Sequence, residues 1–379
     1  MRILHVSSAR AFGGGERHLA DLSNALAERG HDVFAALAPL SPLRDKLTIL
    51  PGQNLITLPL RNSLDVASAF QLARHLRRHR IEILHAHMAR DYLPAVLAAR
   101  WARGVQLVLT RHVLFPLGKF HRATLAHAAR VIAVSEGVAR ALCDQRLLPA
   151  RKITIIPNGI DLRRFDMGPP RAACRQEWRR RLNLRGRLVV GMVGEISPVK
   201  GQEDFLQAAA LIVERHPEVD FVIAGEDASR TGERRARIER LIDQLGLAGR
   251  VHLTGWLDQT GPLLSALDVF VSAARSESFG LAMVEAMACG APVVATRTAG
   301  ACEIIDDGVT GVLVPIGDVR GLAQAIGELL EDPQRRAHLR ERARAEIVNR
   351  FSLEKMVDAT ERLYSEVLAG NRSEGRRNL

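Results

Sequence analysis

This chain of 379 residues is poor in cysteine, in aromatic side chains and in long apolar runs. Its cysteines form no C-x-x-C pair, which argues against a disulfide framework and for a reducing compartment such as the cytoplasm. No run of about 18 apolar residues occurs, so we expect no membrane-spanning helix. The N-terminal MRILHVSSARAFGGGE predicts a first strand, because its apolar run is too short for a signal peptide.

Aromatic residues make up only 4% of the chain, although the formal net charge is +11. Because single-strand binders interleave basic with aromatic residues, this composition argues against a nucleic-acid partner. Residues 1–180 carry 28 Lys and Arg against 13 Asp and Glu, whereas residues 181–379 carry 25 against 29. Only five of the 53 basic residues are lysine, which suggests an arginine-rich coding bias. Such a bias alone would not concentrate the basic residues in one half of the chain. We therefore expect the first half to face an anionic surface or substrate.

Short apolar segments alternate with amphipathic helical segments along most of the chain. We expect strands at residues 3–8, 32–37, 81–87, 105–112, 130–135, 152–159, 188–194, 219–225, 250–255, 268–273 and 291–296. Strands separated by helices predict right-handed βαβ units and parallel sheets. The length fits two domains, and an arginine-rich segment with a Pro-Pro pair interrupts the alternation after residue 162.

We therefore predict an α/β fold of two Rossmann-like domains, at residues 1–165 and 187–352, joined by a linker at 166–186. Ligands of such sheets bind beyond the carboxyl ends of the strands. With two such domains facing each other, we expect the site in the cleft between them.

Three contiguous glycines, Gly13, Gly14 and Gly15, follow the first strand and open a helix. Their amides could approach a phosphate at the positive end of the helix dipole. The spacing differs from G-x-G-x-x-G, and a plain flexible turn is the alternative.

Three histidines stand where predicted strands end. His85 and His87 close one strand and His112 closes another, so all three should lie at the carboxyl edge of the sheet. Hydrogen-bonded surface histidines are the alternative. Since no acidic or cysteine ligand obviously joins them, a sugar or phosphate contact is a simpler hypothesis than a metal.

Lys200 lies on a loop between a strand and a helix, beside Gly201. A lysine at the start of a helix is a common way to hold a diphosphate. The segment does not match G-x-x-x-x-G-K-[ST], and a solvated loop lysine is the alternative.

The stretch RSESFGLAMVEAM sets Glu277 on a strand-to-helix turn and Glu285 inside the helix that follows. One carboxylate could stabilise positive charge at an anomeric carbon, and the other could accept hydrogen bonds from a ribose diol. The free amides of Ser278, Phe279, Gly280 and Leu281 would favour an anion. Two ordinary glutamates that cap and solvate a helix are the alternative.

The chain resembles glycosyltransferase family 4, whose members are retaining enzymes of GT-B fold. The resemblance rests on an ordered set of segments that covers nearly the whole chain. They are GGGERHLADL, HAHMARDY, LTRH, VIAVSEGV, IPNGID, VKGQEDF, RSESFGLAMVEAMACGAPVVAT, DDGVTGVLV and FSLEKM. The most specific of them is the E-x7-E element.

The resemblance implies a role for each candidate residue. In the second domain Glu277 would contact the donor sugar with the amides beside it, Glu285 would bind the donor ribose, and Lys200 would neutralise the diphosphate. In the first domain His112 would lie beside the transferred sugar and the acceptor. The Gly13–Gly15 turn would lie near the diphosphate and acceptor, and a final helix at 353–370 would pack back on the first domain.

One position departs from the family pattern. The family commonly has an arginine five residues before the diphosphate lysine, and this chain has Glu195 there. We expect Glu195 to turn away from the diphosphate or to pair with a neighbouring cation.

The expected activity is metal-independent transfer of a hexose from a UDP- or GDP-sugar to a saccharide or lipid-linked acceptor of the cell envelope. No D-x-D motif is present, so we expect no metal or other cofactor. The basic helix at 69–80 predicts peripheral contact with the anionic inner face of the cytoplasmic membrane. The alternatives are a GT-B sugar-nucleotide epimerase and a basic nucleic-acid- or membrane-binding protein without catalysis.

Overall fold

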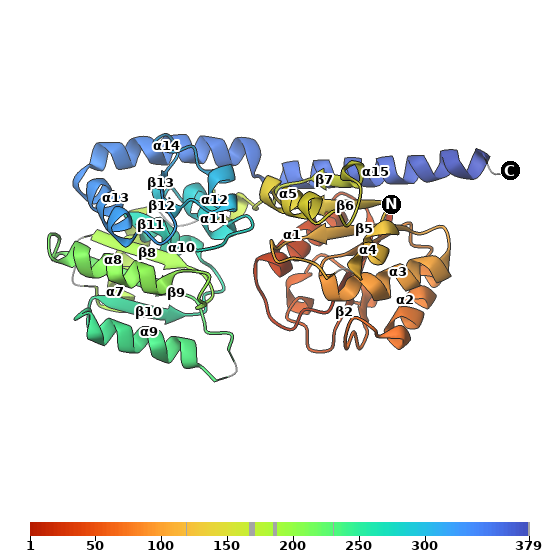
Figure 1. The fold of residues 1–379 in the computed structure, drawn as a ribbon, viewed down its shortest axis with the longest axis horizontal. Helices are drawn as coiled ribbons and strands as arrows, with labels where there is room; N and C mark the ends of the chain where they lie inside the picture. The colour runs from red at the N-terminus through yellow and green to blue at the C-terminus, as the bar shows by residue number, and fades with distance from the viewer. Residues whose placement is uncertain (119, 167–170, 185–187, 230, 378–379) are drawn as a thin grey trace. The chain divides into compact units, whose positions relative to one another are not determined.

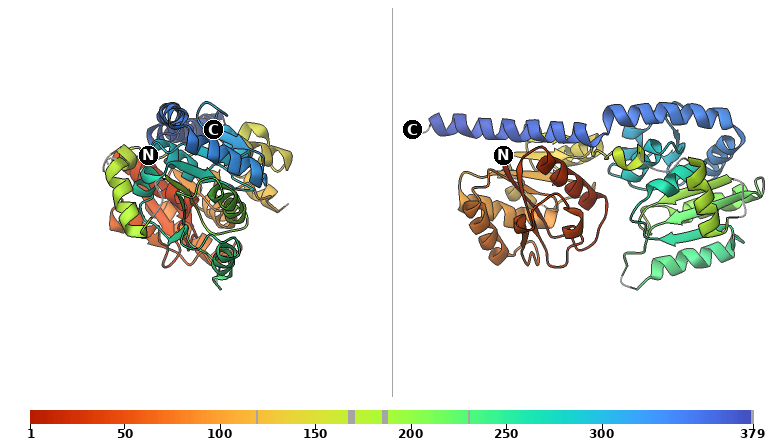
Figure 2. Two further views of the ribbon diagram at one scale, coloured as in Figure 1. Left: turned by 90° about the vertical axis from the view of Figure 1, so that its left-hand side faces the viewer. Right: turned by 180° about the vertical axis from the view of Figure 1, so that it is seen from behind.

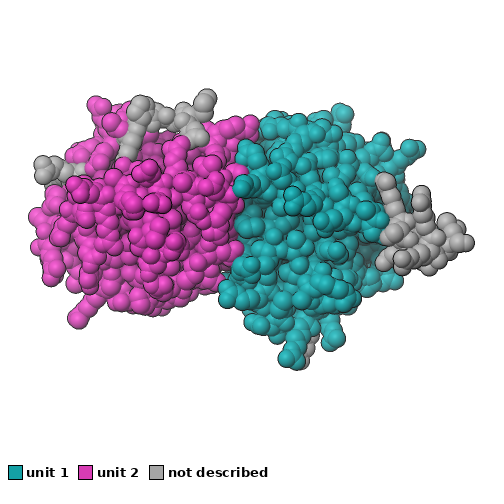
Figure 3. Space-filling view, turned by 90° about the horizontal axis from the view of Figure 1, so that it is seen from above, with its two compact units in different colours: residues 1–159, 353–379 teal, residues 160–352 magenta. Residues whose placement is uncertain are grey.

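The computed structural model describes residues 1–379 apart from 119, 167–170, 185–187, 230 and 378–379. The chain forms two compact units, coloured separately in Figure 3. Unit 1 comprises residues 1–159 and 353–379, and unit 2 comprises residues 160–352. Part of the predicted linker, namely 167–170, 185 and 186, lies outside the described residues.

Unit 1 is built on a seven-stranded parallel sheet in the order β3-β2-β1-β4-β5-β6-β7. Figure 1 labels its strands β2, β5, β6 and β7. The strands are β1 (Arg2–Ser7), β2 (Asp32–Leu37), β3 (Leu55–Thr57), β4 (Ile83–Ala86), β5 (Gln106–Arg111), β6 (Arg130–Ala133) and β7 (Ile153–Ile155). The helices are α1 (Gly14–Glu28), α2 (Val66–Arg78), α3 (Tyr92–Ala102), α4 (His121–Ala126), α5 (Glu136–Asp144) and α15 (Leu353–Arg377). Four short 3-10 turns complete it: η1 (Arg44–Lys46), η2 (Gly52–Asn54), η3 (Ala89–Asp91) and η4 (Ala150–Lys152).

The strand order of unit 1 creates a switch point between β1 and β4. The chain moves one way in the sheet from β1 to β2 and the other way from β4 to β5, so right-handed connections put α1 and α3 on opposite faces. In such sheets ligands bind outside the carboxyl ends of the strands at this point. The Gly13–Gly15 turn follows β1 and His87 follows β4, so both lie there.

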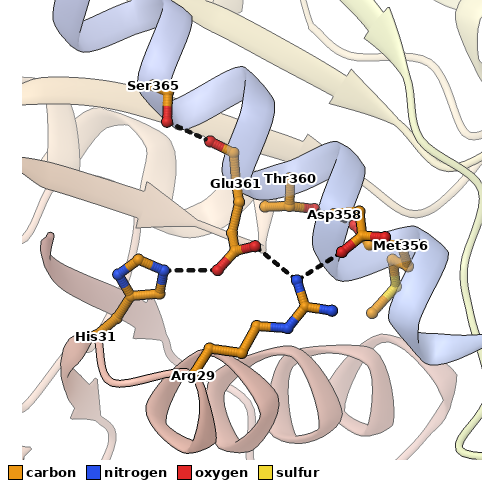
Figure 4. A network of polar contacts seen from close by, with 7 residues as sticks. All are labelled: Arg29, His31, Met356, Asp358, Thr360, Glu361 and Ser365. Carbon is orange, nitrogen blue, oxygen red and sulfur yellow. Dashed lines mark hydrogen bonds and ion pairs between the residues drawn. The ribbon is translucent and has the colours of Figure 1, made fainter.

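Helix α15 is part of unit 1, although it is the last helix of the chain, and it packs against the rest of that unit. Met356, Val357 and Tyr364 share a buried apolar core with Leu19 and Leu22 of α1. Figure 4 shows the polar part of this contact.

Polar groups also join α15 to the rest of unit 1. The Arg29 guanidinium donates from Nη1 to Asp358 Oδ1 and Glu361 Oε2, both at 2.6 Å. His31 Nε2 lies 2.6 Å from Glu361 Oε1, and the Tyr364 hydroxyl lies 2.6 Å from His85 Nδ1.

Unit 2 is built on a six-stranded parallel sheet in the order β10-β9-β8-β11-β12-β13. The strands are β8 (Leu188–Val193), β9 (Val219–Ala224), β10 (Val251–Gly255), β11 (Val269–Ser272), β12 (Val293–Thr296) and β13 (Val312–Val314). The helices are α6 (Arg163–Asp166), α7 (Arg171–Leu182), α8 (Gln202–Val213), α9 (Glu233–Gln244), α10 (Gly261–Ala266), α11 (Leu281–Ala288), α12 (Ala299–Ile304), α13 (Val319–Glu331) and α14 (Pro333–Arg350). Its switch point lies between β8 and β11.

The predicted linker differs from the structure in one respect, because α7 belongs to the body of unit 2. Arg175 donates to both carboxylate oxygens of the buried Asp268, at 3.0 and 2.7 Å. Asp268 also accepts a hydrogen bond from the Val189 amide at 2.9 Å. The boundary between the units therefore falls after Gly159 instead of residue 165.

Two strands were not expected from the sequence, namely β3 and β13. Each has only three residues. Among the described residues no helix combines the length and apolarity needed to cross a bilayer. Figure 2 shows the ribbon from two further sides.

Candidate active site

The turn between β11 and α11 holds the first glutamate of the E-x7-E element. Gly280 has a φ of +109°, and a Cβ on it would overlap the Met283 side chain and lie 3.3 Å from Cγ of Glu277. Only glycine therefore fits between the turn and the helix. Phe279 is buried, with its ring centroid 5.6 Å from that of Phe351. These contacts fix the direction in which Glu277 points.

Glu277 and Lys200 form an ion pair at this turn. Lys200 Nζ lies 2.6 Å from Glu277 Oε2, and their side chains are 31% and 16% exposed. Since β8 and β11 are neighbours in the sheet, the loops that follow them meet at the switch point. Two groups 77 positions apart in sequence are thus brought into one site.

Glu285 occupies a different environment from Glu277. It is 7% exposed inside α11, and its Oε2 accepts a hydrogen bond of 2.9 Å from the Thr260 hydroxyl. Because Glu277 lies before the helix, the two carboxylates are not constrained to one helical face.

The start of α11 offers donors to an anion. Within the described part of the chain, no residue accepts a hydrogen bond from the backbone amides of Ser278, Phe279, Gly280 or Leu281. The positive end of the helix dipole adds to these donors. Together with Lys200, this end of the sheet is suited to a phosphate or diphosphate.

The loop that carries Lys200 is packed tightly on the end of β11. Gly201 has a φ of +71°, and a Cβ there would overlap the carbonyl oxygen of Ala273. The Arg275 amide donates to the Val199 carbonyl at 2.8 Å. The guanidinium of Arg275 donates to both oxygens of Asp204, at 2.9 and 3.2 Å. The position of Lys200 is therefore set by backbone contacts.

Glu195, the departure from the family pattern, pairs with a neighbouring cation as expected. Its Oε1 lies 3.4 Å from Nη1 of Arg234, and the two side chains are 51% and 43% exposed. An exposed pair at this distance contributes about 0–1 kcal/mol, so a ligand can separate it at little cost.

In unit 1 the three glycines form the start of α1, but one of their amides is already engaged. The Gly13 amide donates to Glu16 Oε2 at 3.0 Å, which is one half of a capping box, because glycine has no side chain to make the other half. An anion at this turn would therefore meet the Glu16 carboxylate. A Cβ on Gly15 would lie 3.6 Å from the ring of His112, so the glycine turn and His112 are direct neighbours.

The expectation that His85 faces an acceptor is wrong. His85 is fully buried, and its ring nitrogens bond to the hydroxyls of Tyr364 and Thr110, both at 2.6 Å. It therefore has a structural role that links α15 to the sheet. His87 and His112 do lie past the ends of β4 and β5, with ring centroids 5.8 Å apart.

Two further histidines, His5 and His18, belong to the same cluster and were missed from the sequence. His5 of β1 pairs in register with His85, and its Nδ1 lies 3.0 Å from His87 Nε2. The His18 ring lies 4.8 Å from that of His112. Burial lowers the pKa of His5 to about 3 and that of His18 to about 4. It also lowers the pKa values of His85, His87 and His112, so all five rings are neutral.

Two family models match consecutive parts of the chain. The model of glycosyltransferase family 4 matches residues 12–164, and that of the group 1 glycosyl transferases matches residues 175–346. The lipopolysaccharide core biosynthesis glycosyltransferase LpsE of Rhizobium meliloti is 30% identical, over 97% of this chain and 99% of that protein. The chain belongs to glycosyltransferase family 4. It is a glycosyltransferase, as the motif set predicted.

One solved structure and one further sequence relative also match this family 4 chain over most of its length. Anabaena Alr3699/HepE, solved with UDP and glucose, is 25% identical and superposes with a TM-score of 0.85 over 96% of this chain and 99% of that one. The N-acetyl-alpha-D-glucosaminyl L-malate synthase of Bacillus anthracis is 28% identical over 93% of this chain and 94% of that protein. The predicted GT-B fold, with two Rossmann-like parallel-sheet domains, is confirmed.

Proposed function

We propose that this glycosyltransferase is a retaining enzyme that moves a hexose from a nucleotide-diphosphate sugar to a saccharide or lipid-linked acceptor in cell-envelope glycan synthesis. The observation that carries the proposal is the 2.6 Å pair of Lys200 with Glu277 beside the free amides that begin α11. It combines a cation for a diphosphate with a carboxylate for a sugar.

The donor phosphates are held by Lys200 and by the amides of residues 278–281. In the free protein Glu277 neutralises Lys200. On donor binding the ammonium group turns to the diphosphate, and Glu277 is freed to face the anomeric carbon. Glu285, kept in place by Thr260, accepts hydrogen bonds from the ribose diol. The chemistry requires no divalent cation, because these groups supply the positive charge.

Transfer takes place on one face of the sugar. The bond between the anomeric carbon and the phosphate oxygen breaks, and the acceptor oxygen bonds to the same face of an oxocarbenium-like centre. The acceptor proton passes to the leaving diphosphate, and Glu277 stabilises the developing positive charge. His112 contacts the acceptor as a neutral hydrogen-bonding group, whereas the buried His87 lies behind it and supports its ring.

A uridine donor is favoured by the relative HepE, which was solved with UDP and glucose. An acceptor of the lipopolysaccharide core is favoured by LpsE, which matches the chain over nearly its full length. We take UDP-hexose and a core saccharide as the first pair to test.

Contact with an anionic membrane is supported by the surface of α2. Arg74, Arg77 and Arg78 are exposed on it, and Phe70 is 55% exposed beside Trp101, with ring centroids 6.4 Å apart. Basic residues beside exposed aromatic rings suit an anionic lipid surface.

A donor screen tests the proposal. Thermal unfolding is followed with UDP- and GDP-sugars, and the best donor is then incubated with core saccharides. We expect selective stabilisation by one nucleotide and a product whose anomeric configuration, read by NMR, equals that of the donor. Inversion would overturn the retaining assignment, and no stabilisation by any nucleotide sugar would overturn the donor site.

A further inference from the structure

The five clustered histidines of unit 1, four of them buried and His112 partly exposed, exceed what sugar transfer needs. His85 and His87 lie 4.1 Å apart by ring centroid, His18 and His112 4.8 Å, and His5 and His87 5.2 Å. They come from β1, α1, β4 and the ends of β4 and β5, so the strand order of the sheet brings them together.

Most of their ring nitrogens have no hydrogen-bond partner. His85 is satisfied at both nitrogens, and His5 and His87 share one bond of 3.0 Å. Among the described residues, no partner reaches His5 Nε2, His87 Nδ1, or either ring nitrogen of His112, whereas the Asn158 side chain is a hydrogen-bonding neighbour of His18. A buried polar group without a partner costs about 1–3 kcal/mol, so the four nitrogens of His5, His87 and His112 in one cluster call for a ligand.

Three of these rings converge in a way that suits a metal ion. One ring nitrogen from each of His18, His87 and His112 lies within 4.8 Å of the others. Bound to one tetrahedral Zn²⁺, such nitrogens would lie ~3.4 Å apart, which small ring rotations can reach.

We propose that His18, His87 and His112 form a three-histidine site for Zn²⁺ or a similar divalent ion. His87 binds through Nδ1, because its Nε2 faces His5 Nδ1 at 3.0 Å and can donate to it. A metal-binding histidine commonly donates its second ring N–H in this way. His18 and His87 are buried, whereas His112 is partly exposed.

A bound ion would act on the transferase. It would hold the His112 ring next to Gly15, at the turn where the acceptor side begins. Since the proposed function has His112 contact the acceptor, Zn²⁺ at this site inhibits transfer. This consequence rests on the proposed function, whereas binding of the ion does not.

Metal binding is measured on the full chain without an affinity tag, after treatment with EDTA and desalting. Titration with Zn²⁺ alone should show one tight site and a rise in the unfolding temperature. Co²⁺ in its place should give the intense visible absorption of a four-coordinate ion. Weak absorption typical of six-coordinate Co²⁺, or no tight site, would overturn the proposal.

Substitutions locate the ion. H18N, H87N and H112N should each weaken Zn²⁺ binding by at least about 10- to 100-fold, since changes of outer-shell partners alone cost that much. The matched control is H75N/H79N, which removes two stacked rings on α2 with centroids 6.0 Å apart. If that control abolishes tight binding, the ion sits on α2 and the proposal is wrong. Far-UV circular dichroism and thermal unfolding of the metal-free protein report whether each variant is folded.

The two proposals fail separately. Turnover without Zn²⁺ but no tight Zn²⁺ binding would remove the metal site and leave the transferase. Tight Zn²⁺ binding at His18, His87 and His112 without transfer from any nucleotide sugar would leave the metal site and remove the transferase. Tight binding that leaves turnover unchanged would overturn the inhibition.

Discussion

At the scale of single residues, the proposed donor binding and the proposed chemistry both depend on the Lys200–Glu277 pair. Each partner is neutralised by the other at 2.6 Å in the free protein, and each has a different proposed partner in the donor complex. The same two residues therefore serve binding and chemistry. Substituting them one at a time separates the two roles.

Replacing Glu277 by glutamine keeps the size of the side chain and removes its charge. Charge at the anomeric centre develops mainly in the transition state, so E277Q should lower kcat by roughly 10²–10³. Affinity for nucleoside diphosphate should change little. Steady-state kinetics and a binding titration check both. E239Q, on the surface of α9, is the matched control, and wild-type turnover by E277Q would remove Glu277 from the mechanism.

Lys200 is the principal side-chain cation proposed for the diphosphate, because Glu195 stands where the family commonly has arginine. A charge-assisted hydrogen bond contributes about 1.5–3 kcal/mol, so K200A should weaken nucleoside diphosphate binding about 10- to 100-fold. E195R should bind it equally well or better, with E195Q as the control for loss of the Arg234 pair. If K200A binds like the wild type, or E195R abolishes binding, the diphosphate lies elsewhere.

At the scale of elements, the loop between β8 and α8 depends on one glycine. Gly201 and Gly232 have nearly the same φ, +71° and +69°, but only Gly201 lies against backbone, at Ala273. G232A should cost about 1–2 kcal/mol from the left-handed conformation alone. G201A should cost more and also weaken donor binding, because the backbone must move. Thermal unfolding of G201A and G232A is compared with and without nucleoside diphosphate. Equal losses of stability in the two variants would show that the contact of Gly201 with the Ala273 backbone does not matter.

Helix α15 should depend more on its buried hydrogen bond than on its surface ion pairs. Y364F would leave the buried His85 Nδ1 without its partner, at a cost of about 1–3 kcal/mol. E361Q weakens contacts to Arg29 and His31 that are partly exposed, so it should cost about 0–1 kcal/mol. Thermal unfolding temperatures rank the two variants. A larger fall in the unfolding temperature of E361Q than of Y364F would show that the surface ion pairs matter more than the buried hydrogen bond.

At the scale of the whole molecule, the charge is divided between the two units. Unit 1 carries 27 Lys and Arg against 15 Asp and Glu, whereas unit 2 carries 26 against 27. The basic excess seen in the first half of the sequence thus belongs almost entirely to one folded unit. Such a field attracts an anionic partner to that unit and weakens with salt.

Binding to anionic vesicles should follow from this division. Each basic residue near such a surface contributes about 1 kcal/mol, so R74Q/R77Q/R78Q should weaken binding about 100-fold at low salt. R235Q/R237Q/R240Q removes the same charge from α9 of unit 2 and should have little effect. Co-sedimentation at two salt concentrations checks this. If the wild type does not bind anionic vesicles at low salt, the proposed membrane contact is wrong.

The sequence by itself determined the βαβ alternation, the two-domain fold and the family, because these depend on local periodicity and on short ordered motifs. It could not show which loops meet, since contacts such as Lys200 with Glu277 follow from β8 lying beside β11. Only the tertiary structure decided that α7 belongs to unit 2 and that His85 is a core residue bonded to Tyr364. It also decided that His5 and His18 join His87 and His112, because neighbouring parallel strands align residues that sequence separation keeps apart.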